Sequence, residues 1–374
     1  MASTSYGVND ALAVKLWAKE LAHEAVKATE IYPLIGPNAN SVIQEKTESK
    51  KGPGDRVTIG LRMQLTGDGF TESEIAEGNG EALTTYADNV FINELGHVVG
   101  VRSENTIDAQ RVAFDLREEA KDGLVDWWAR RISVAFFNQV CGNSAVSGTT
   151  FPTSVKYTGL NATIAPSAGR VLRFDTGGTG ASIANDETVN TTTTATFGLP
   201  VIDKAVELAK TGGTNNLPKI RPIRIEGGEH YVMYIHPIQT TQLRAGTNAG
   251  QWLDIQKAAM TGGEITNNPI FTGALGMYNN VILRESEQIP FGVHSTSGAQ
   301  QTSTRRAVFL GAQSAAITFG MNSGENRYRW NEELYDHKRR LEVSAWSIYG
   351  LKKMVFNAID FATIVVTSYG VPAA

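Results

Sequence analysis

The stretch TIDAQRVAFDLREEAKDGLVDWWARRISVAFFNQVC, residues 106–141, decides the fold of this chain. Its apolar residues, among them Leu124, Trp128 and Ile132, recur at spacings of three and four, which is the pattern of one face of an α-helix. A helix over the whole stretch is about 54 Å long. Gly142-Asn143 follows it and is typical of a left-handed helix cap. Because few compact enzymes need one helix of this length, we expect a flat, elongated subunit that uses it as a beam.

The segment before this helix has the pattern of a long hairpin. Val57, Ile59 and Leu61 alternate with polar residues, as in a strand with one apolar face, and the alternation continues to Leu65. A second β-rich run extends from Tyr86 to Val101, with acidic residues between the two runs. A two-stranded hairpin buries too little apolar surface to be stable alone. We therefore expect it to rest on another surface, a neighbouring subunit being one candidate.

The remaining segments predict a mixed architecture. Residues 8–31 have the pattern of an amphipathic helix ended by Tyr32-Pro33, and a polar stretch without sustained period follows. Residues 143–197 are rich in Thr, Ser and Gly and predict an irregular inserted loop. Further patterns predict helices at 199–210 and 237–244, and strands at 231–235, 281–284, 307–310, 316–319, 339–349 and 354–366. This order of elements indicates an α+β fold rather than a doubly wound one.

Composition narrows the class of protein. The 34 basic and 38 acidic residues give a formal net charge of -4, which argues against a protein that coats nucleic acid by neutralising its phosphates. The single cysteine, Cys141, cannot form an intramolecular disulfide and is expected to be a small buried hydrophobe in a protein of a reducing cytoplasm. Neither a secretory signal nor an apolar run of membrane-spanning length occurs, so we expect no membrane partner.

No spacing in the sequence indicates an enzyme, and we expect no catalytic residue, cofactor or metal. There is no phosphate-binding loop, no dinucleotide fingerprint and no nucleophile elbow. The six histidines are scattered. The glutamates of residues 72–77 lack the spacing of a calcium loop and fit a solvated acidic tip or a contact with a basic neighbour.

The basic counterpart that the sequence offers is Lys338-Arg339-Arg340. A solvated turn and a contact with packaged DNA are alternatives for these three residues. We predict inter-subunit contacts within two segments, at Gly67, Asp68, Gly69, Phe70, Glu72, Glu74, Glu77, Lys338, Arg339 and Arg340.

Four phrases point to a known family: VFINELGHVVGV (90–101), IFTGALGMYNNVILRES (270–286), VFLGAQSAAITFG (308–320) and YGLKKMVFNAIDFATI (349–364). Together with the order of segments, they resemble the coat proteins of tailed phages with the Hong-Kong-97-type fold, especially the family typified by the coat of the podovirus N-four. The resemblance runs over nearly the whole chain. The Thr- and Gly-rich stretch departs from it as an apparent insertion.

The resemblance implies a division of the chain. It implies an N-terminal arm (1–50), an extended loop (51–101), a peripheral domain (102–236) with a spine helix (104–142) and the inserted loop (143–197), an axial domain (237–325) and return strands of the peripheral domain (326–374). No Lys and Asn pair can be assigned to covalent cross-linking, so non-covalent assembly is expected.

The resemblance also implies a function and partners. The expected function is a major capsid protein that assembles with itself into hexamers and pentamers of an icosahedral head, in the host cytoplasm, and becomes part of the virion. The head encloses double-stranded DNA without sequence-specific binding, and portal, scaffolding and decoration proteins are possible partners. Another self-assembling phage protein, of a decoration or tail kind, is the first alternative, and an intracellular enzyme is the second.

Overall fold

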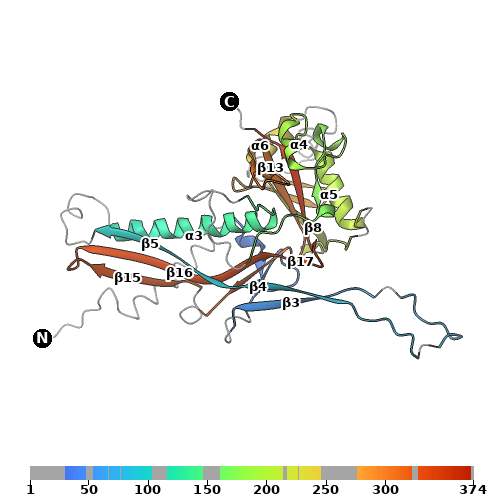
Figure 1. Ribbon diagram of the computed structural model, residues 1–374, viewed down its shortest axis with the longest axis horizontal. Helices are drawn as coiled ribbons and strands as arrows, with labels where there is room; N and C mark the ends of the chain where they lie inside the picture. Colours follow the sequence, from blue (N-terminus) through green and yellow to red (C-terminus); the bar gives the residue numbers. More distant parts are fainter. Residues whose placement is uncertain are drawn as a thin grey trace.

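The protein is elongated: a beam-shaped lobe carries a more rounded lobe near one of its ends, and a thin hairpin projects beyond that end (Figure 1). We describe it from a computed structural model. The described residues are 30–47, 54–65, 67–75, 77–102, 116–145, 161–213, 217–225, 227–245, 276–321 and 327–371. The arrangement confirms the expected α+β class and the elongated shape.

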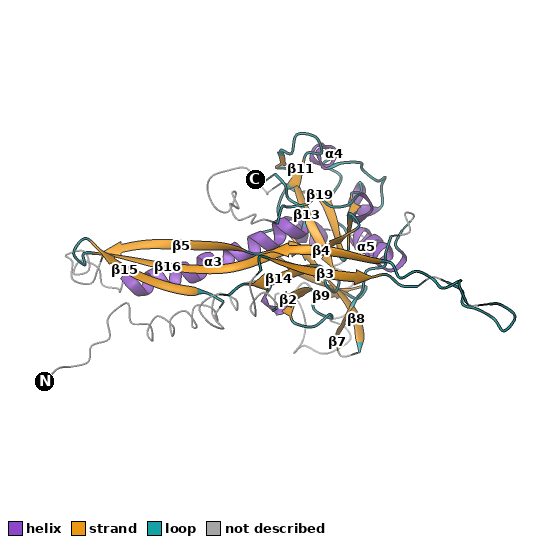
Figure 2. Ribbon diagram, turned by 60° about the horizontal axis from the view of Figure 1, so that its bottom comes forward, coloured by secondary structure: helices purple, strands orange, loops and turns teal. Residues whose placement is uncertain are grey.

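The beam-shaped lobe is a six-stranded sheet with one long helix on its face (Figure 2). The strands run in the order β1-β2-β14-β16-β15, and β5 also pairs with β16. Their bounds are β1 Ile35–Gly36, β2 Ile43–Lys46, β5 Asn93–Arg102, β14 Ala315–Phe319, β15 Arg329–Tyr335 and β16 Arg340–Lys353. The one-turn helix η1, Tyr32–Leu34, precedes β1.

The long helix α3, Leu116–Val140, lies along β5 and β16 (Figure 1). The part of the predicted helix before residue 116 lies outside the described residues. Trp128 has no exposed surface and packs edge-on between Tyr328 and Tyr349, at ring-centroid distances of 5.0 and 6.1 Å. Large aromatic side chains contribute most of the apolar burial in such a seam. This cluster packs the middle of α3 against the sheet.

The predicted left-handed cap of α3 is confirmed. Gly142 has a φ of 64°, and the backbone N–H of Asn143 donates to the carbonyl oxygen of Asn138 over 2.9 Å. A Cβ at Gly142 would lie 2.6 Å from Cδ of Pro166. Glycine is therefore needed here both for its backbone conformation and for the close approach of the following chain.

The rounded lobe is built on a seven-stranded sheet with the order β6-β19-β13-β8-β10-β9, in which β7 also pairs with β8. Its strands are β6 Val171–Leu172, β7 Ile223–Ile225, β8 Gly228–Ile235, β9 Gly276–Tyr278, β10 Val281–Glu285, β13 Thr304–Leu310 and β19 Thr363–Tyr369. Its helices are η3 Ala168–Arg170, η4 Thr176–Gly178, α4 Asp186–Thr191, α5 Leu199–Thr211 and α6 Pro237–Ala245. Two short hairpins, β11 (Gly292–Val293) with β12 (Gln300–Gln301) and β17 (Val355–Phe356) with β18 (Ile359–Asp360), complete the strands outside the two sheets and the projecting hairpin.

Sheet membership cuts across the boundaries expected from sequence. Strand β8 lies before residue 236 and β13 after it, yet they pair with each other, whereas β14 lies in the sheet of the beam. The stretch 143–197 is also more ordered, where described, than an irregular loop. Arg170 and Asp186 within it are almost fully buried, and β6 pairs with β19. These strands pair with partners far away in the sequence. The spacing of apolar residues along the chain indicates which segments are strands but not which strands pair.

The projecting hairpin joins β3, Arg56–Arg62, to β4, Thr85–Phe91. The predicted first strand is confirmed but ends at Arg62, so Leu65 lies in the loop. The predicted second run is divided in two, because β4 pairs with β3 while β5 turns away to pair with β16. A small apolar cluster of Val90, Ala316, Met354 and Phe356 joins the base of the hairpin to the beam.

Candidate assembly interface

The tip of the hairpin is an exposed loop with acidic and apolar side chains. The backbone N–H of Met63 donates to the carbonyl oxygen of Thr84 over 3.0 Å, just beyond the ends of β3 and β4. In the loop that follows, the predicted contact residues are all exposed: Gly67, Asp68, Gly69, Phe70, Glu72, Glu74 and Glu77. Large apolar side chains are exposed beside them, by 58% at Leu65, 50% at Phe70, 75% at Ile75 and 56% at Leu83. An apolar group of this kind outside any core is typical of a surface that binds another protein.

Local bonds shape this tip. The backbone N–H of Gly67 donates to Oε2 of Glu81 over 2.9 Å, and that of Thr71 donates to Oε2 of Glu74 over 2.9 Å. Gly69 and Gly78 have φ values of 83° and 82°, a region that favours glycine. Glu74 thus folds back on the loop, while its neighbouring carboxylates face solvent.

The base of the hairpin is held rigidly. Asp88, which is 7% exposed, forms an ion pair with Lys352 and accepts from the backbone N–H of Val355 over 3.0 Å. The Asn161 side chain accepts from the Phe91 N–H (2.9 Å) and donates to the Phe91 carbonyl (2.6 Å), as a neighbouring strand would. The tip therefore projects from a fixed base.

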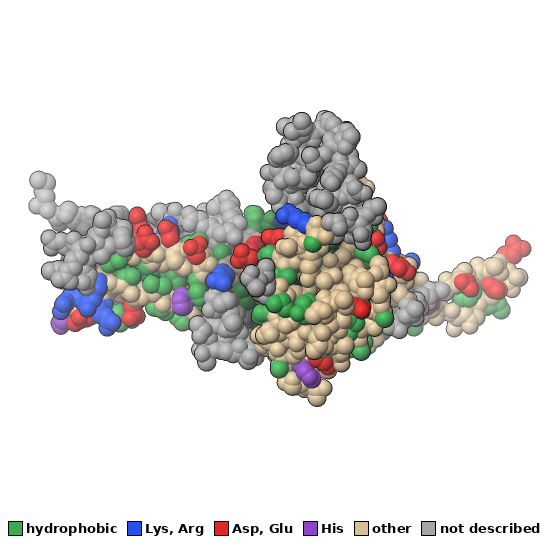
Figure 3. Space-filling model, turned by 90° about the horizontal axis from the view of Figure 1, so that it is seen from above, with side chains coloured by type: hydrophobic (Ala, Val, Ile, Leu, Met, Phe, Trp, Pro, Cys, Tyr) green, Lys and Arg blue, Asp and Glu red, His purple; other side chains and the backbone are tan. Residues whose placement is uncertain are grey.

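The basic residues lie in the turn between β15 and β16. Asp336, His337 and Lys338 have φ values of 50°, 53° and 67°, so three consecutive residues adopt the left-handed region. The backbone N–H of Arg339 closes the turn on the Tyr335 carbonyl over 3.1 Å. The side chains of Lys338, Arg339 and Arg340 are exposed, and they present positive charge at this end of the beam (Figure 3).

The acidic tip and the basic turn lie at opposite ends of the molecule. The loop beyond β3 and β4 extends to one end of the long axis, and the turn between β15 and β16 lies at the other (Figure 1). The structure therefore does not bring the predicted contact residues together within one chain. A contact between tip and turn requires a second copy, and because the two patches differ, repetition of that contact is heterologous.

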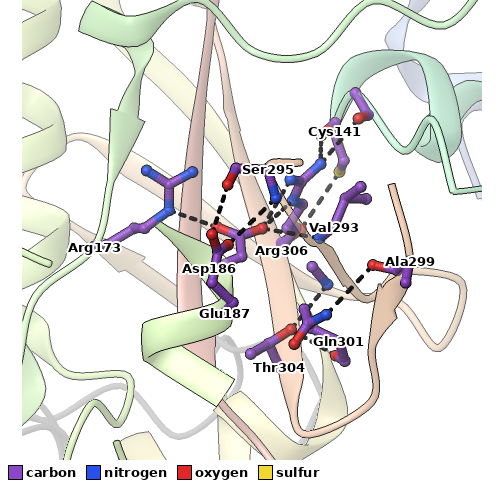
Figure 4. Close-up of polar contacts among 12 residues, drawn as sticks. Cys141, Arg173, Asp186, Glu187, Val293, Ser295, Ala299, Gln301, Thr304 and Arg306 are labelled. Atoms are coloured by element: carbon purple, nitrogen blue, oxygen red, sulfur yellow. Dashed lines mark hydrogen bonds and ion pairs between the residues drawn. The ribbon is translucent and has the colours of Figure 1, made fainter. Parts of the chain in front are cut away.

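A buried ion cluster, which sequence patterns did not reveal, joins the two lobes (Figure 4). Asp186 of α4 has a fully buried side chain that contacts Arg306 of β13 at 2.7 Å and Arg173 at 2.5 Å. It also accepts from the Val293 N–H over 3.1 Å. Burial by itself would raise the pKa of Asp186, but the charges of Arg306 and Arg173 hold it below the ordinary value.

Arg306 carries this cluster to the end of the long helix. Its Nη1 donates to the carbonyl oxygens of Cys141 and Gly142, at 3.0 and 2.9 Å. Carbonyl groups at a helix C-terminus lack intrahelical partners and favour a cation. One arginine of the rounded lobe thus caps the helix of the beam, and it is held there by Asp186.

Metal-ligating clusters and free cysteines are two groups that often carry chemistry. No group of three or more His, Cys, Asp or Glu among them is placed to hold a metal ion. Cys141 is buried as predicted, and burial raises its pKa to about 12, so its thiol stays protonated. Within the described part of the chain, no helix is both long enough and apolar enough to cross a membrane.

Comparison with known proteins agrees with this geometry. A family model described as phage capsid protein matches residues 5–372. The chain is 26% identical over 364 residues to the major capsid protein of Pseudomonas phage KPP25, covering 92% of this chain and 90% of that protein.

Solved structures give the same result. The capsid of Ralstonia phage GP4 is similar over 100% of both chains, with 31% identity and a TM-score of 0.75. The capsid of cyanophage Pam1 is similar over 100% of this chain and 95% of that one, with 20% identity and a TM-score of 0.67. The fold expected from the resemblance is thereby confirmed.

Proposed function

The chain belongs to the family of phage capsid proteins, and from this premise we propose that it builds the icosahedral head of a tailed phage as hexamers and pentamers that enclose double-stranded DNA. It is the major capsid protein, a component of the virion. The observation that carries the proposal is the placement of a projecting acidic and apolar tip at one end of an elongated subunit and a basic turn at the other.

We assign the family's domains by sheet membership. The beam, with α3 and the sheet around β16, is the peripheral domain, and the rounded lobe around β13 is the axial domain. The projecting hairpin from β3 to β4 is the extended loop. The predicted arm, residues 1–50, is attached to the peripheral domain through β1 and β2, which belong to the sheet of the beam. In this assignment the rounded lobes meet at the centre of each hexamer or pentamer, and the beams form its periphery.

Neighbouring subunits engage tip to turn in this proposal. Glu72 and Glu77 face Lys338 and Arg339 of the next copy, and the apolar side chains of Phe70 and Ile75 are covered in the same contact. Each contact is weak because its charges remain near solvent. Repetition around the shell makes the assembly stable, since each subunit is held by several neighbours at once.

The formal charge of -4 suits a shell that encloses DNA without gripping it. Assembly takes place in the bacterial cytoplasm. This compartment is reducing, and the single cysteine, Cys141, has no disulfide to form there. Portal, scaffolding and decoration proteins are the further partners of such a head. A decoration or tail protein is the alternative, and it differs in the form of the assembly.

Electron microscopy of the purified protein, expressed alone and with the neighbouring phage genes, tests the function. Closed polyhedral shells, or rings of six and five subunits, are expected. Tubes or trimers under both conditions would instead favour the tail or decoration alternative. A stable monomer under both conditions would contradict assembly and would favour the alternative of an enzyme.

A further inference from the structure

The solvent face of α3 carries a row of carboxylates. Glu118, Asp122 and Asp126 are exposed and lie at intervals of four residues, which places them along one side of the helix. The exposed Glu119 lies at the edge of this side, and we refer to the four residues as the acidic row. At a rise of 1.5 Å per residue, the row from Glu118 to Asp126 is about 12 Å long. Acidic side chains accordingly follow the beam towards the rounded lobe (Figure 3).

The acidic row is not neutralised within the described part of the chain. No hydrogen bond or ion pair among those residues involves its four carboxylates, whereas the exposed Glu94 pairs with Arg329 at 2.9 Å. Like charges four residues apart destabilise a helix. Asp122 and Asp126 also lie beyond the first turn of the described helix, where the helix dipole no longer favours negative charge. A partner that brings positive charge would relieve this repulsion.

The acidic row leads to a cleft of about 680 Å³ between α3 and the rounded lobe. Asp126 lines the cleft from the helix, and Glu30 and Glu287 also line it. Burial raises the pKa of Glu30, a hydrogen bond with Ser286 lowers it, and the charge of Glu287 raises it again. The negative charge of the row therefore continues into the cleft.

Two buried acceptors in the cleft lack a donor. Asn143 lines the cleft and is 4% exposed. Its amide nitrogen donates to Asn138 over 2.8 Å, but its Oδ1 has no hydrogen-bond partner among the described residues. The same holds for Oε1 of Gln288. Buried acceptors without donors cost free energy. Together with the carboxylates, they favour a ligand that supplies N–H donors and positive charge.

The arrangement indicates an extended ligand rather than a single ion. No group of three or more His, Cys, Asp or Glu among the described residues is placed to hold a metal ion, so one cation does not bridge the carboxylates of the cleft. The phosphates of DNA would be repelled by the row. A helix with Lys or Arg at every fourth residue repeats the spacing of the row, and its charges meet the carboxylates one by one when the two helices lie side by side.

We propose that the acidic row binds a basic helix of a partner protein, which places one further Lys or Arg side chain in the adjoining cleft. That side chain lies near Glu30 and Glu287. It stays away from Arg305, which also lines the cleft and stacks on the Phe291 ring at 3.7 Å. The inference goes beyond the proposed function and does not rest on it, because it concerns the outer face of α3 in a single subunit.

Peptide binding to the full-length protein tests the spacing. The probe is a fluorescein-labelled, alanine-rich helical peptide with three lysines four residues apart, and the control peptide has the same composition with its lysines spread around the helix. Fluorescence anisotropy follows the titration at a protein concentration where sedimentation shows unassembled subunits. We expect the probe to bind several-fold more tightly than the control peptide. Equal affinities, or no binding of either peptide, would overturn the proposal.

Neutralising the row tests the location. The combined variant Glu118→Gln, Asp122→Asn and Asp126→Asn should bind the probe about tenfold more weakly, because each exposed ion pair contributes a factor of about two in affinity. Dimers of the wild type that this variant does not form would assign the row to a second copy and overturn the proposal.

The matched control neutralises three exposed carboxylates of the hairpin tip: Glu72→Gln, Glu74→Gln and Glu77→Gln. It changes the net charge by the same amount and should leave the affinity for the probe unchanged. An equal weakening in the two variants would mean that net charge alone attracts the peptide, and it would overturn the assignment to α3.

A longer probe tests the cleft. It carries a fourth lysine after a two-glycine linker, which lets this side chain reach beyond Asp126. We expect the wild type to bind it several-fold more tightly than the shorter probe. Glu287→Gln should remove this gain, whereas Glu285→Gln, at an exposed residue that does not line the cleft, should keep it. No gain in the wild type, or the same gain in both variants, would overturn the role of the cleft.

Discussion

Arg306 donates from Nε to Oδ2 of Asp186 over 2.8 Å, with both side chains almost fully buried. The same guanidinium also donates to the carbonyl oxygen of Gly142 at the end of α3, so this pair links the two lobes. Asp186→Asn removes the charge that balances two arginines, and we expect a loss of about 3–5 kcal/mol in the free energy of unfolding. Denaturant unfolding followed by tryptophan fluorescence measures it.

The exposed pair of Arg329 and Glu94, 2.9 Å apart, is the control for that measurement. Glu94→Gln should change the free energy of unfolding by no more than about 1 kcal/mol, because both groups stay solvated. If Asp186→Asn and Glu94→Gln lowered the free energy of unfolding equally, burial would not make the Asp186 ion pair more important for stability than an exposed pair.

Acid should weaken the protein through the same carboxylate. The pKa of Asp186 in the folded chain lies below its ordinary value of 3.8, so the unfolded chain binds this proton more readily. The stabilisation is therefore complete above that value and is lost as the pH falls through the lower, folded pKa. Unfolding of the wild type between neutral and acid pH, compared with Asp186→Asn, measures it: the difference between the two should shrink only at the acid end. A constant difference at every pH would contradict this linkage.

A glycine in the beam is predicted to be irreplaceable for steric reasons. A Cβ at Gly96 of β5 would lie 2.2 Å from the indole ring of Trp346 on the paired strand β16. We expect Gly96→Ala to destabilise the protein by about 1–3 kcal/mol, and Trp346→Leu in the same chain to recover part of the loss. Thermal unfolding measures both.

Gly123 of α3 provides the opposite case. A Cβ added at Gly123 would meet no atom within 4 Å apart from the helix's own backbone, and inside a helix alanine is favoured over glycine by about 0.5–1 kcal/mol. Gly123→Ala should therefore stabilise the protein. If Gly123→Ala lowered the free energy of unfolding as much as Gly96→Ala does, the cost of Gly96→Ala could not be assigned to the contact with Trp346.

Sequence patterns predict the local elements well and their partners poorly. The burial of α3, its cap at Gly142 and strands such as β10 and β13 follow from short-range spacing. The division of residues 86–101 between two sheets does not, because both parts are β-rich and the separation depends on pairing with β16. Asp186 gives no signal either, since its partner Arg306 lies 120 residues away in the chain. The predicted contact residues, chosen from turn residues and charge, stay a prediction, and only the fold shows that they lie at opposite ends of the molecule.

Charge reversal should show whether the two ends meet. Replacing Glu72, Glu74 and Glu77 with Lys, or Lys338, Arg339 and Arg340 with Glu, should each reduce the yield of shells, because like charges then face each other across every contact. The combined variant restores opposite charges and should recover shells, and added salt should weaken assembly of the wild type, since the groups are exposed. Electron microscopy and sedimentation measure the yield. The second reversal restores only the attraction between tip and turn. If the combined variant gave no more shells than the single reversals, tip and turn would therefore contact other surfaces.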